Sequence, residues 1–218
     1  AGVSAHRIRN RAVTDAYEPG SSIKPLAVLS ALEFGSAKVD SLIDTSPGWM
    51  HLGGNIVRDS RNYGEIDLTE IIRKSSNMGT SKLALSVPKE FLLDMFYNVG
   101  LMSGSGANLL GEINGIFNET NRWSEFELST LSFGYGISVT ALQLARMYSI
   151  LGDGGIRRPL SIIKPDTPVE SERVISAEAT QQVLQMMETS MSLKVSFIMQ
   201  VKPQHRFLPK LWLLVYKC

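Results

Sequence analysis

Cysteine is almost absent from this 218-residue sequence, and the single one is Cys218 at the last position. One cysteine excludes an intramolecular disulfide framework and a cysteine-based metal site. The three histidines, His6, His51 and His205, are far apart and lack the paired spacing of zinc ligands. We therefore expect no metal site.

An excess of charge of one sign is also missing, since the formal net charge is only +1. Residues 190–218 hold five Lys or Arg and no Asp or Glu, which leaves 17 basic and 21 acidic residues in positions 1–189, a net of −4. A slightly acidic body with scattered charges lacks the basic footprint of a nucleic-acid-binding protein. Nucleic acid is therefore not expected as a partner.

Long hydrophobic runs are lacking as well. The sequence does not begin with a charged region and a long apolar stretch, so we expect neither a signal peptide nor a membrane anchor in it. The apolar run within residues 211–218 is far shorter than the roughly 20 residues that cross a bilayer. With 44% hydrophobic and 20% charged residues, the composition is that of a globular domain.

Apolar periodicity, punctuated by Gly and Pro, predicts a mostly helical chain. The expected helices cover residues 21–34, 67–74, 79–87 and 88–99, and three more follow N-caps at Ser124, Thr140 and Ser176, the last running through Thr189. The best strand signal is residues 158–164. Residues 40–63, which hold several Gly and Pro, predict an irregular excursion with room for a short hairpin.

The most informative segment places Ser21 and Lys24 three residues apart at a helix entrance formed by Pro19 and Gly20. Residues at this spacing share a helix face, so the Ser21 hydroxyl and the Lys24 amine can meet. A lysine activates a serine only when its pKa falls well below the usual value of about 10.4, and burial and the helix dipole both lower it. The Ser21 N–H can also face a developing oxyanion. This segment predicts a nucleophile, its base and half of an oxyanion hole.

The same spacing occurs twice more, so spacing alone is weak evidence. Pro88 interrupts the pair Ser86 and Lys89. The pair Ser161 and Lys164 falls on the expected strand, where residues three apart point to opposite faces. The alternative for Ser21 itself is a plain helix cap.

A second polar element, Lys74-Ser75-Ser76-Asn77, lies between two helical stretches and separates them. A second hydroxyl such as that of Ser75 can pass a proton between base and leaving amine, and the Asn77 amide can hold a substrate carbonyl. The triplet Ser60-Arg61-Asn62 has the same form and is a competing candidate. For both, a loop with an N-cap is the alternative.

Together these elements resemble the penicillin-binding proteins and serine β-lactamases, whose motifs are S-x-x-K, S-x-N and K-T-G. The likeness extends over residues 1–189. Class B transpeptidases have segments similar to residues 9–15, 18–21 and 74–79. Their division-specific member, penicillin-binding protein 3, has segments similar to residues 122–124, 132–136 and 139–145. The resemblance implies an α+β, penicillin-recognising serine transpeptidase or β-lactamase-like fold.

The resemblance implies that Ser21 is the acylated nucleophile, Lys24 its base, and Ser75 and Asn77 the second motif. It places Gly134, Tyr135 and Gly136 at the rim of a substrate site, although packing explains these residues equally well. It implies no metal or organic cofactor. The implied partners are peptidoglycan stem peptides, β-lactam antibiotics, and the septal glycan polymerase with other divisome proteins. The implied location is the periplasmic face of the inner membrane.

The largest departure of the sequence from the family is that no Lys-Thr-Gly or Lys-Ser-Gly string occurs in it. All 18 glycines lie within residues 1–189. We therefore expect a partial transpeptidase domain over residues 1–189, with much of the antiparallel sheet missing, and an aberrant tail over residues 190–218. Two alternatives stay open: a catalytically dead, truncated or frameshifted fragment, and a serine β-lactamase of the same fold.

Overall fold

A computed structural model describes residues 9–107, 109–117, 123–161, 166 and 170–195. Its helices are α1 (Arg11–Thr14), α2 (Lys24–Phe34), α3 (Leu68–Lys74), α4 (Asn77–Leu85), α5 (Lys89–Asn98), α6 (Glu125–Ser132), α7 (Ala141–Gly152) and α8 (Ala177–Val195), with a 3-10 helix, η2, over Gly20–Ile23. Its strands are β1 (Ala16–Tyr17), β2 (Leu42–Asp44), β3 (Trp49–Leu52), β4 (Asn55–Arg58), β5 (Glu65–Asp67), β6 (Ile116–Phe117), β7 (Ile137–Thr140), β8 (Ile156–Arg157) and β9 (Glu172–Arg173).

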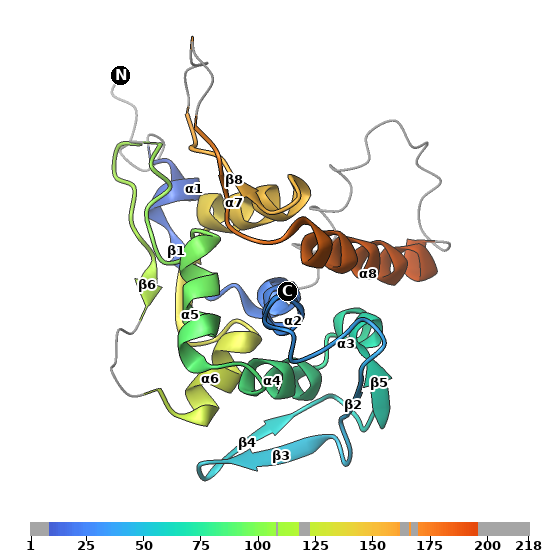
Figure 1. The fold of residues 1–218 in the computed structure, drawn as a ribbon. Coiled ribbons are helices and arrows are strands. Elements are labelled where there is room, and N and C mark those ends of the chain that lie inside the picture. The colour runs from blue at the N-terminus through green and yellow to red at the C-terminus, as the bar shows by residue number, and fades with distance from the viewer. Residues whose placement is uncertain (1–8, 108, 118–122, 162–165, 167–169, 196–218) are drawn as a thin grey trace.

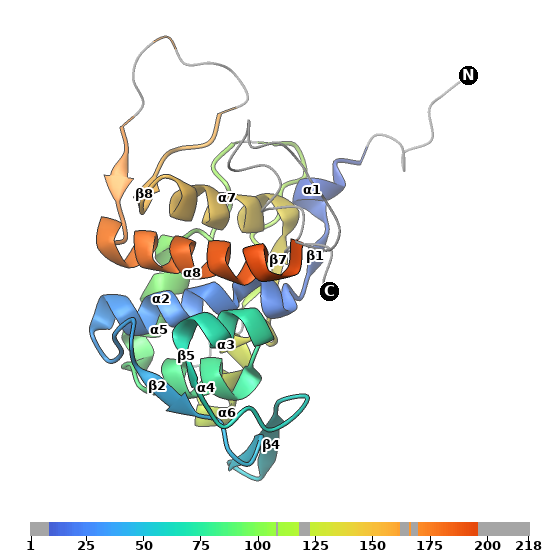
Figure 2. The same ribbon diagram turned by 90° about the vertical axis from the view of Figure 1, so that its right-hand side faces the viewer.

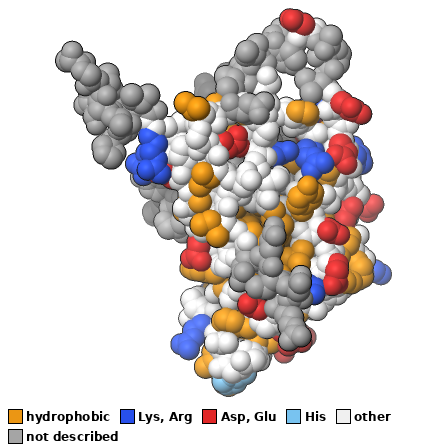
Figure 3. Space-filling view, turned by 90° about the vertical axis from the view of Figure 1, so that its left-hand side faces the viewer, with side chains coloured by type: hydrophobic (Ala, Val, Ile, Leu, Met, Phe, Trp, Pro, Cys, Tyr) orange, Lys and Arg blue, Asp and Glu red, His pale blue; other side chains and the backbone are white. Residues whose placement is uncertain are grey.

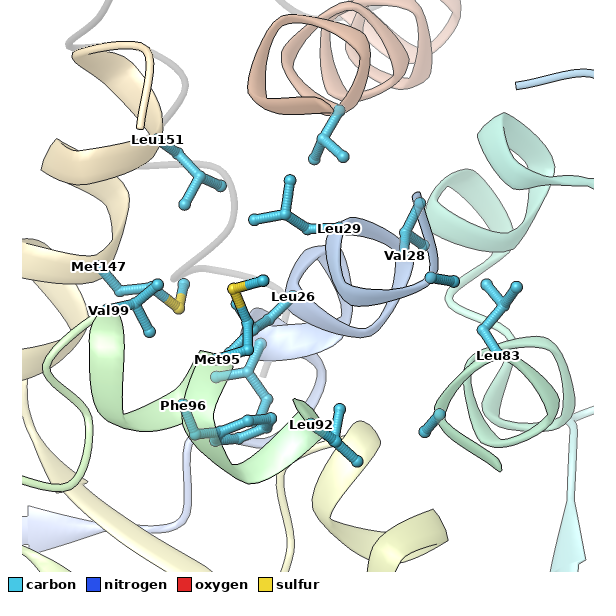
Figure 4. Packing of buried hydrophobic residues seen from close by; sticks show 14 of the residues in the cluster. Leu26, Val28, Leu29, Leu83, Leu92, Met95, Phe96, Val99, Met147 and Leu151 are labelled. Atoms are coloured by element: carbon cyan, nitrogen blue, oxygen red, sulfur yellow. The ribbon is translucent and has the colours of Figure 1, made fainter. Parts of the chain in front are cut away.

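Helix α2 forms the centre of the molecule. Residues 24–31 of this helix are all buried, a pattern typical of a helix that is covered on every side. Helices α4, α5 and α8 contact α2 directly, and Figures 1 and 2 show it lying between α8 on one side and α4 and α5 on the other. Figure 4 shows Leu26, Val28 and Leu29 among side chains of α4, α5 and α7. The core therefore holds the amino-terminal end of α2 in place.

The ends of the helices follow the predicted capping residues. Ser124 and Thr140 each form a complete capping box with the residue three positions later. The Ser176 Oγ accepts from the Ala179 N–H, and Gly35 ends α2 with a φ of 82°. These caps are confirmed. Helix α8, however, continues to Val195 instead of ending at Thr189.

The described strands form small antiparallel sheets, with strand orders β1-β7-β6, β2-β5, β3-β4 and β8-β9. The hairpin expected within residues 40–63 is confirmed as β3 and β4. The strand expected over residues 158–164 is wrong for residues 158–161, because the strand lies at Ile156–Arg157 and Pro159 has no N–H for a ladder. Residues 162–165 lie outside the described part. The mixture of helices and small sheets confirms the predicted α+β class.

One face of the molecule, drawn in Figure 3, shows acidic, basic and apolar side chains interspersed on its described surface. Among the described residues, no helix is both long and apolar enough to cross a membrane. The hairpin of β3 and β4 projects from the end of the molecule beyond α4, as Figure 1 shows. Its position next to α4 brings it close to the candidate site.

Candidate active site

Ser21 lies on η2, immediately before α2, and not within the α-helix that was expected to begin there. In a 3-10 helix residues three apart lie one above the other, so this change keeps Ser21 and Lys24 on one face. Ser21 is exposed, whereas residues 22–30 are buried. The first N–H groups of a helix have no acceptor within it and lie at the positive end of its dipole. Ser21 therefore presents both a hydroxyl and an N–H at an accessible helix start.

Other elements hold this helix start firmly. The Ser22 Oγ donates to the Pro19 carbonyl oxygen at 2.7 Å, and the Tyr148 hydroxyl on α7 donates to the Ser22 carbonyl oxygen at 2.5 Å. Gly20 has a φ of 56°, a backbone conformation that suits glycine. The position of Ser21 is therefore set by contacts on both sides of it.

Lys24 joins the two predicted motifs. Its residue is 3% exposed, and its Nζ donates to the Ser75 carbonyl oxygen at 2.5 Å and to the Ser75 Oγ at 2.9 Å. A buried amine is tolerated only when hydrogen-bonded, so these contacts fix where the Lys24 head group lies. Lys24 thus links the helix entrance that carries Ser21 to Ser75, and the catalytic roles of the three residues stay a prediction.

Ser75 owes its orientation to an unusual backbone conformation. It ends α3 with a φ of 56° and a ψ of 47°, and it is the one non-glycine residue with positive φ in the described ranges. Such a conformation costs a non-glycine residue on the order of 1 kcal/mol and is kept only where the surroundings impose it. Here it allows the carbonyl oxygen and the hydroxyl of the same residue both to face Lys24.

The sequence reasoning missed Asp59, which organises the second motif from the end of β4. Its carboxylate accepts from the Ser76 Oγ at 2.6 Å, the Asn77 N–H at 2.5 Å and the Met78 N–H at 3.0 Å. These donors lie at the start of α4, where a negative charge is favourable. No local pattern marks Asp59, because its partners lie 17 to 19 residues away in the sequence.

Asn77 begins α4, and its Nδ2 donates to the Arg58 carbonyl oxygen at 3.0 Å. An amide nitrogen carries two hydrogens, so one more bond can be made from the same group. The competing triplet is engaged locally instead: the Ser60 and Tyr63 hydroxyls are 2.8 Å apart, and Asn62 Oδ1 accepts from the Gly64 N–H. The geometry therefore favours Ser75 and Asn77 over that triplet.

The predicted rim residues lie in the turn after α6. The Gly134 carbonyl oxygen accepts from the Gly20 N–H at 3.1 Å, and the Gly136 N–H donates to Glu18 Oε1 at 3.2 Å. Tyr135 is 52% exposed. The two glycines therefore have a structural role at the helix entrance, and a role of this turn in substrate binding stays a prediction.

Comparisons with known proteins agree with this arrangement. Residues 3–197 match the family described as the penicillin binding protein transpeptidase domain. The chain is 43% identical over 188 residues to the peptidoglycan D,D-transpeptidase FtsI of Escherichia coli K12, covering 86% of this chain and 32% of that protein. It is 40% identical over 182 residues to FtsI of Buchnera aphidicola subsp. Schizaphis graminum, covering 84% of this chain and 32% of that protein. The chain thus spans about a third of the length of these curated relatives.

Solved structures show the same likeness. The apo transpeptidase domain of penicillin-binding protein 3 from Burkholderia pseudomallei superposes with a TM-score of 0.80 at 32% identity, covering 84% of this chain and 56% of that one. A peptidoglycan glycosyltransferase from Burkholderia ambifaria gives a TM-score of 0.79 at 32% identity, covering 83% and 58%. Because the family match spans most of its residues, this chain belongs to the penicillin-binding protein transpeptidase family.

Proposed function

We propose that this chain is part of a serine D,D-transpeptidase that cross-links peptidoglycan stem peptides in septal wall synthesis and is acylated by β-lactams. The observation that carries the proposal is the buried Lys24 Nζ, 2.9 Å from the Ser75 Oγ, beside the helix start that presents Ser21. It joins a nucleophile, a base and a second hydroxyl, which are the groups that acyl transfer requires.

In the first step, the Ser21 Oγ bonds to the carbonyl carbon of the D-Ala-D-Ala peptide bond while unprotonated Lys24 takes the hydroxyl proton. The Ser21 N–H stabilises the oxygen that becomes negative. The peptide C–N bond then breaks, and D-alanine leaves after its nitrogen receives a proton through the Ser75 hydroxyl. The free hydrogen of the Asn77 amide binds a carbonyl of the stem peptide.

In the second step, an amine of a neighbouring stem peptide attacks the ester on Ser21. The amine loses a proton through Ser75 to Lys24, the ester C–O bond breaks, and the Ser21 Oγ regains a proton. A new amide cross-link results, without a metal or an organic cofactor. A β-lactam enters the first step as a mimic of the dipeptide and leaves an ester that lasts.

The partners and location of the whole protein form part of the same proposal. They are stem peptides as substrates, the septal glycan polymerase and divisome proteins as partners, and the periplasmic face of the inner membrane as location. Family membership and the relatives' names support them.

The test is covalent labelling by a fluorescent penicillin of two proteins. One is the 218-residue chain, and the other is a chimera in which residues 190–218 are replaced by the corresponding segment of the E. coli relative. We expect the chimera to be labelled and its Ser21→Ala variant not to be. Full labelling of that variant would contradict the assignment of Ser21.

A non-catalytic product is a second candidate, favoured by the lack of a Lys-Thr-Gly or Lys-Ser-Gly string in the sequence. In the family, the strand that carries this string supplies the second oxyanion N–H and a lysine for the substrate carboxylate. Loss of one oxyanion donor costs about 10² to 10³ in rate. Intact-mass measurement with benzylpenicillin decides between the two. A stoichiometric adduct on the 218-residue chain rejects this candidate, whereas an adduct on the chimera alone supports it.

A further inference from the structure

The hairpin of β3 and β4 has two different faces. Side chains alternate along a strand, so one face packs Met50, Leu52 and Val57 toward Met78 and Phe133. The cross-strand pairs Trp49 with Arg58 and His51 with Ile56 put these four residues together on the other face. The outer face therefore combines aromatic, aliphatic and basic side chains.

This outer face lines a pocket of about 430 Å³, whose remaining lining residues are Pro47, Gly48, Asp59, Arg61 and Asn62. Its size lies within the range of small-molecule sites, about 300 to 1,000 Å³. The Asp59 N–H donates to the Gly48 carbonyl oxygen at 2.9 Å. A Cβ on Gly48 would lie 2.9 Å from the Asn62 nitrogen, so only glycine lets the two walls approach this closely. The pocket is therefore a built feature of the backbone.

The charge balance of the pocket favours an anion. Arg58 and Arg61 line it, and neither forms an ion pair within the described part of the chain. The single acidic lining residue, Asp59, already accepts three hydrogen bonds from the second motif. The Arg61 guanidinium lies 5.3 Å from the centre of the Tyr63 ring, which orients it without neutralising it. A guanidinium that forms no ion pair within the described residues can bind a carboxylate through two parallel hydrogen bonds.

The apolar part of the pocket favours a ring-shaped group. Trp49 is 48% exposed and Ile56 is 44% exposed, although both are large hydrophobic residues. His51 lies edge-on to Trp49 with the ring centres 5.2 Å apart, which fixes the indole. An accessible indole beside two arginines matches a sugar ring that carries carboxylate groups.

We propose that this pocket binds a carboxylate-bearing saccharide–peptide unit of the cell-wall polymer, with a carboxylate on Arg58 and Arg61 and a sugar ring on Trp49. The identity of the polymer rests on the proposed function. The pocket lies directly behind the second motif, since the Arg58 carbonyl oxygen binds Asn77 and the Asp59 carboxylate binds Ser76. The pocket would bind the polymer at a point away from the peptide bond that reacts.

The test measures binding of a soluble disaccharide–tetrapeptide to the full 218-residue chain carrying Ser21→Ala, by calorimetry and NMR titration. We expect Arg58→Gln, Arg61→Gln and Trp49→Ala each to weaken binding about 10-fold or more, because each removes a charged hydrogen bond or a stacking surface. Arg158→Gln is the matched control, since Arg158 is exposed and pairs with Asp153 outside the pocket. That variant should bind unchanged.

Three further comparisons decide the chemistry. Arg58→Lys keeps the charge but not the forked geometry, so it should bind between the parent chain and Arg58→Gln, and it guards against loss of folding in the latter. Equal affinity for a saccharide–peptide with blocked carboxylates would overturn the proposal. The absence of measurable binding would also overturn it. Equal affinity for an acidic peptide without sugar would overturn it too, and would point to a protein partner. Because Ser21→Ala cannot be acylated, this result is independent of the penicillin-labelling test of the proposed function.

Discussion

The backbone nitrogen of Gly20 lies 3.1 Å from the carbonyl oxygen of Gly134 and donates a hydrogen bond to it. The two residues pack so closely that a Cβ on Gly134 would lie 2.0 Å from the Gly20 carbonyl oxygen. Gly134 also has a φ of 89°, which favours glycine. The turn after α6 thus packs closely against Gly20, the residue that precedes Ser21.

Gly134→Ala should therefore lower the free energy of unfolding by about 2 to 4 kcal/mol, through backbone strain and overlap with Gly20 together. Gly154→Ala is the control, because Gly154 has a φ of 66° but nothing within 4 Å of an added Cβ. That change should cost about 1 kcal/mol. Urea unfolding measures both, and equal losses would show that the contact with Gly20 is unimportant.

Asp59→Asn should slow acylation of the chimera by a fluorescent penicillin about 10-fold or more. The amide replaces one acceptor oxygen by a donor that faces the hydroxyl and N–H groups of Ser76, Asn77 and Met78. A buried donor left without its acceptor costs about 1 to 3 kcal/mol. Labelling rates over a range of drug concentrations measure the effect.

The control for Asp59 is Asp153→Asn, which removes a carboxylate of an exposed ion pair with Arg158. Exposed pairs of this kind contribute about 1 kcal/mol at most. Acylation by this variant should match the unaltered chimera. If Asp59→Asn also acylates at the parent rate, the second motif does not depend on this carboxylate.

Lys24→Ala in the chimera should reduce the acylation rate by about 10² to 10⁴, the contribution of a general base. Lys82→Ala is matched to it, because the Lys82 Nζ likewise donates to a backbone carbonyl, that of Asp44, at 2.5 Å. The Lys82 variant should acylate normally. A similar loss in both variants would mean that Lys24 acts through stability and not as the base.

The penicilloyl ester on Ser21 should outlast the assay. A class A β-lactamase deacylates with a glutamate in a Glu-x-x-Leu-Asn string, and no such string occurs here. Hydrolysis of a chromogenic cephalosporin by the chimera should therefore stop after one equivalent. Continuous turnover would instead favour the β-lactamase alternative.

The parts of the site that local chemistry defines could be predicted from the sequence. Ser21 and Lys24 share a helix entrance, and the capping residues Ser124 and Thr140 mark the starts of α6 and α7. The contacts between distant segments could not be predicted, because no spacing rule relates Asp59 to Ser76 or Gly134 to Gly20. The 3-10 turn at Ser21 was missed for a similar reason, since packing of the surrounding helices decides it.

The pocket behind the second motif could not be predicted from the sequence either. Residues 40–63 predicted a hairpin, yet the alternation that puts Trp49 and Arg58 on one face depends on a register that turn residues alone do not specify. The strand expected over residues 158–164 was wrong for residues 158–161, because the pairing of β8 with β9 ends at Arg157.

The identity of the nucleophile is tested most directly by mapping the site of acylation. The chimera is incubated with benzylpenicillin, digested with a protease, and its peptides are sequenced by mass spectrometry. We expect one penicilloyl group per molecule, on Ser21, and none in the Ser21→Ala variant. An adduct on any other residue, such as Ser75, or an adduct that persists without Ser21, would contradict it.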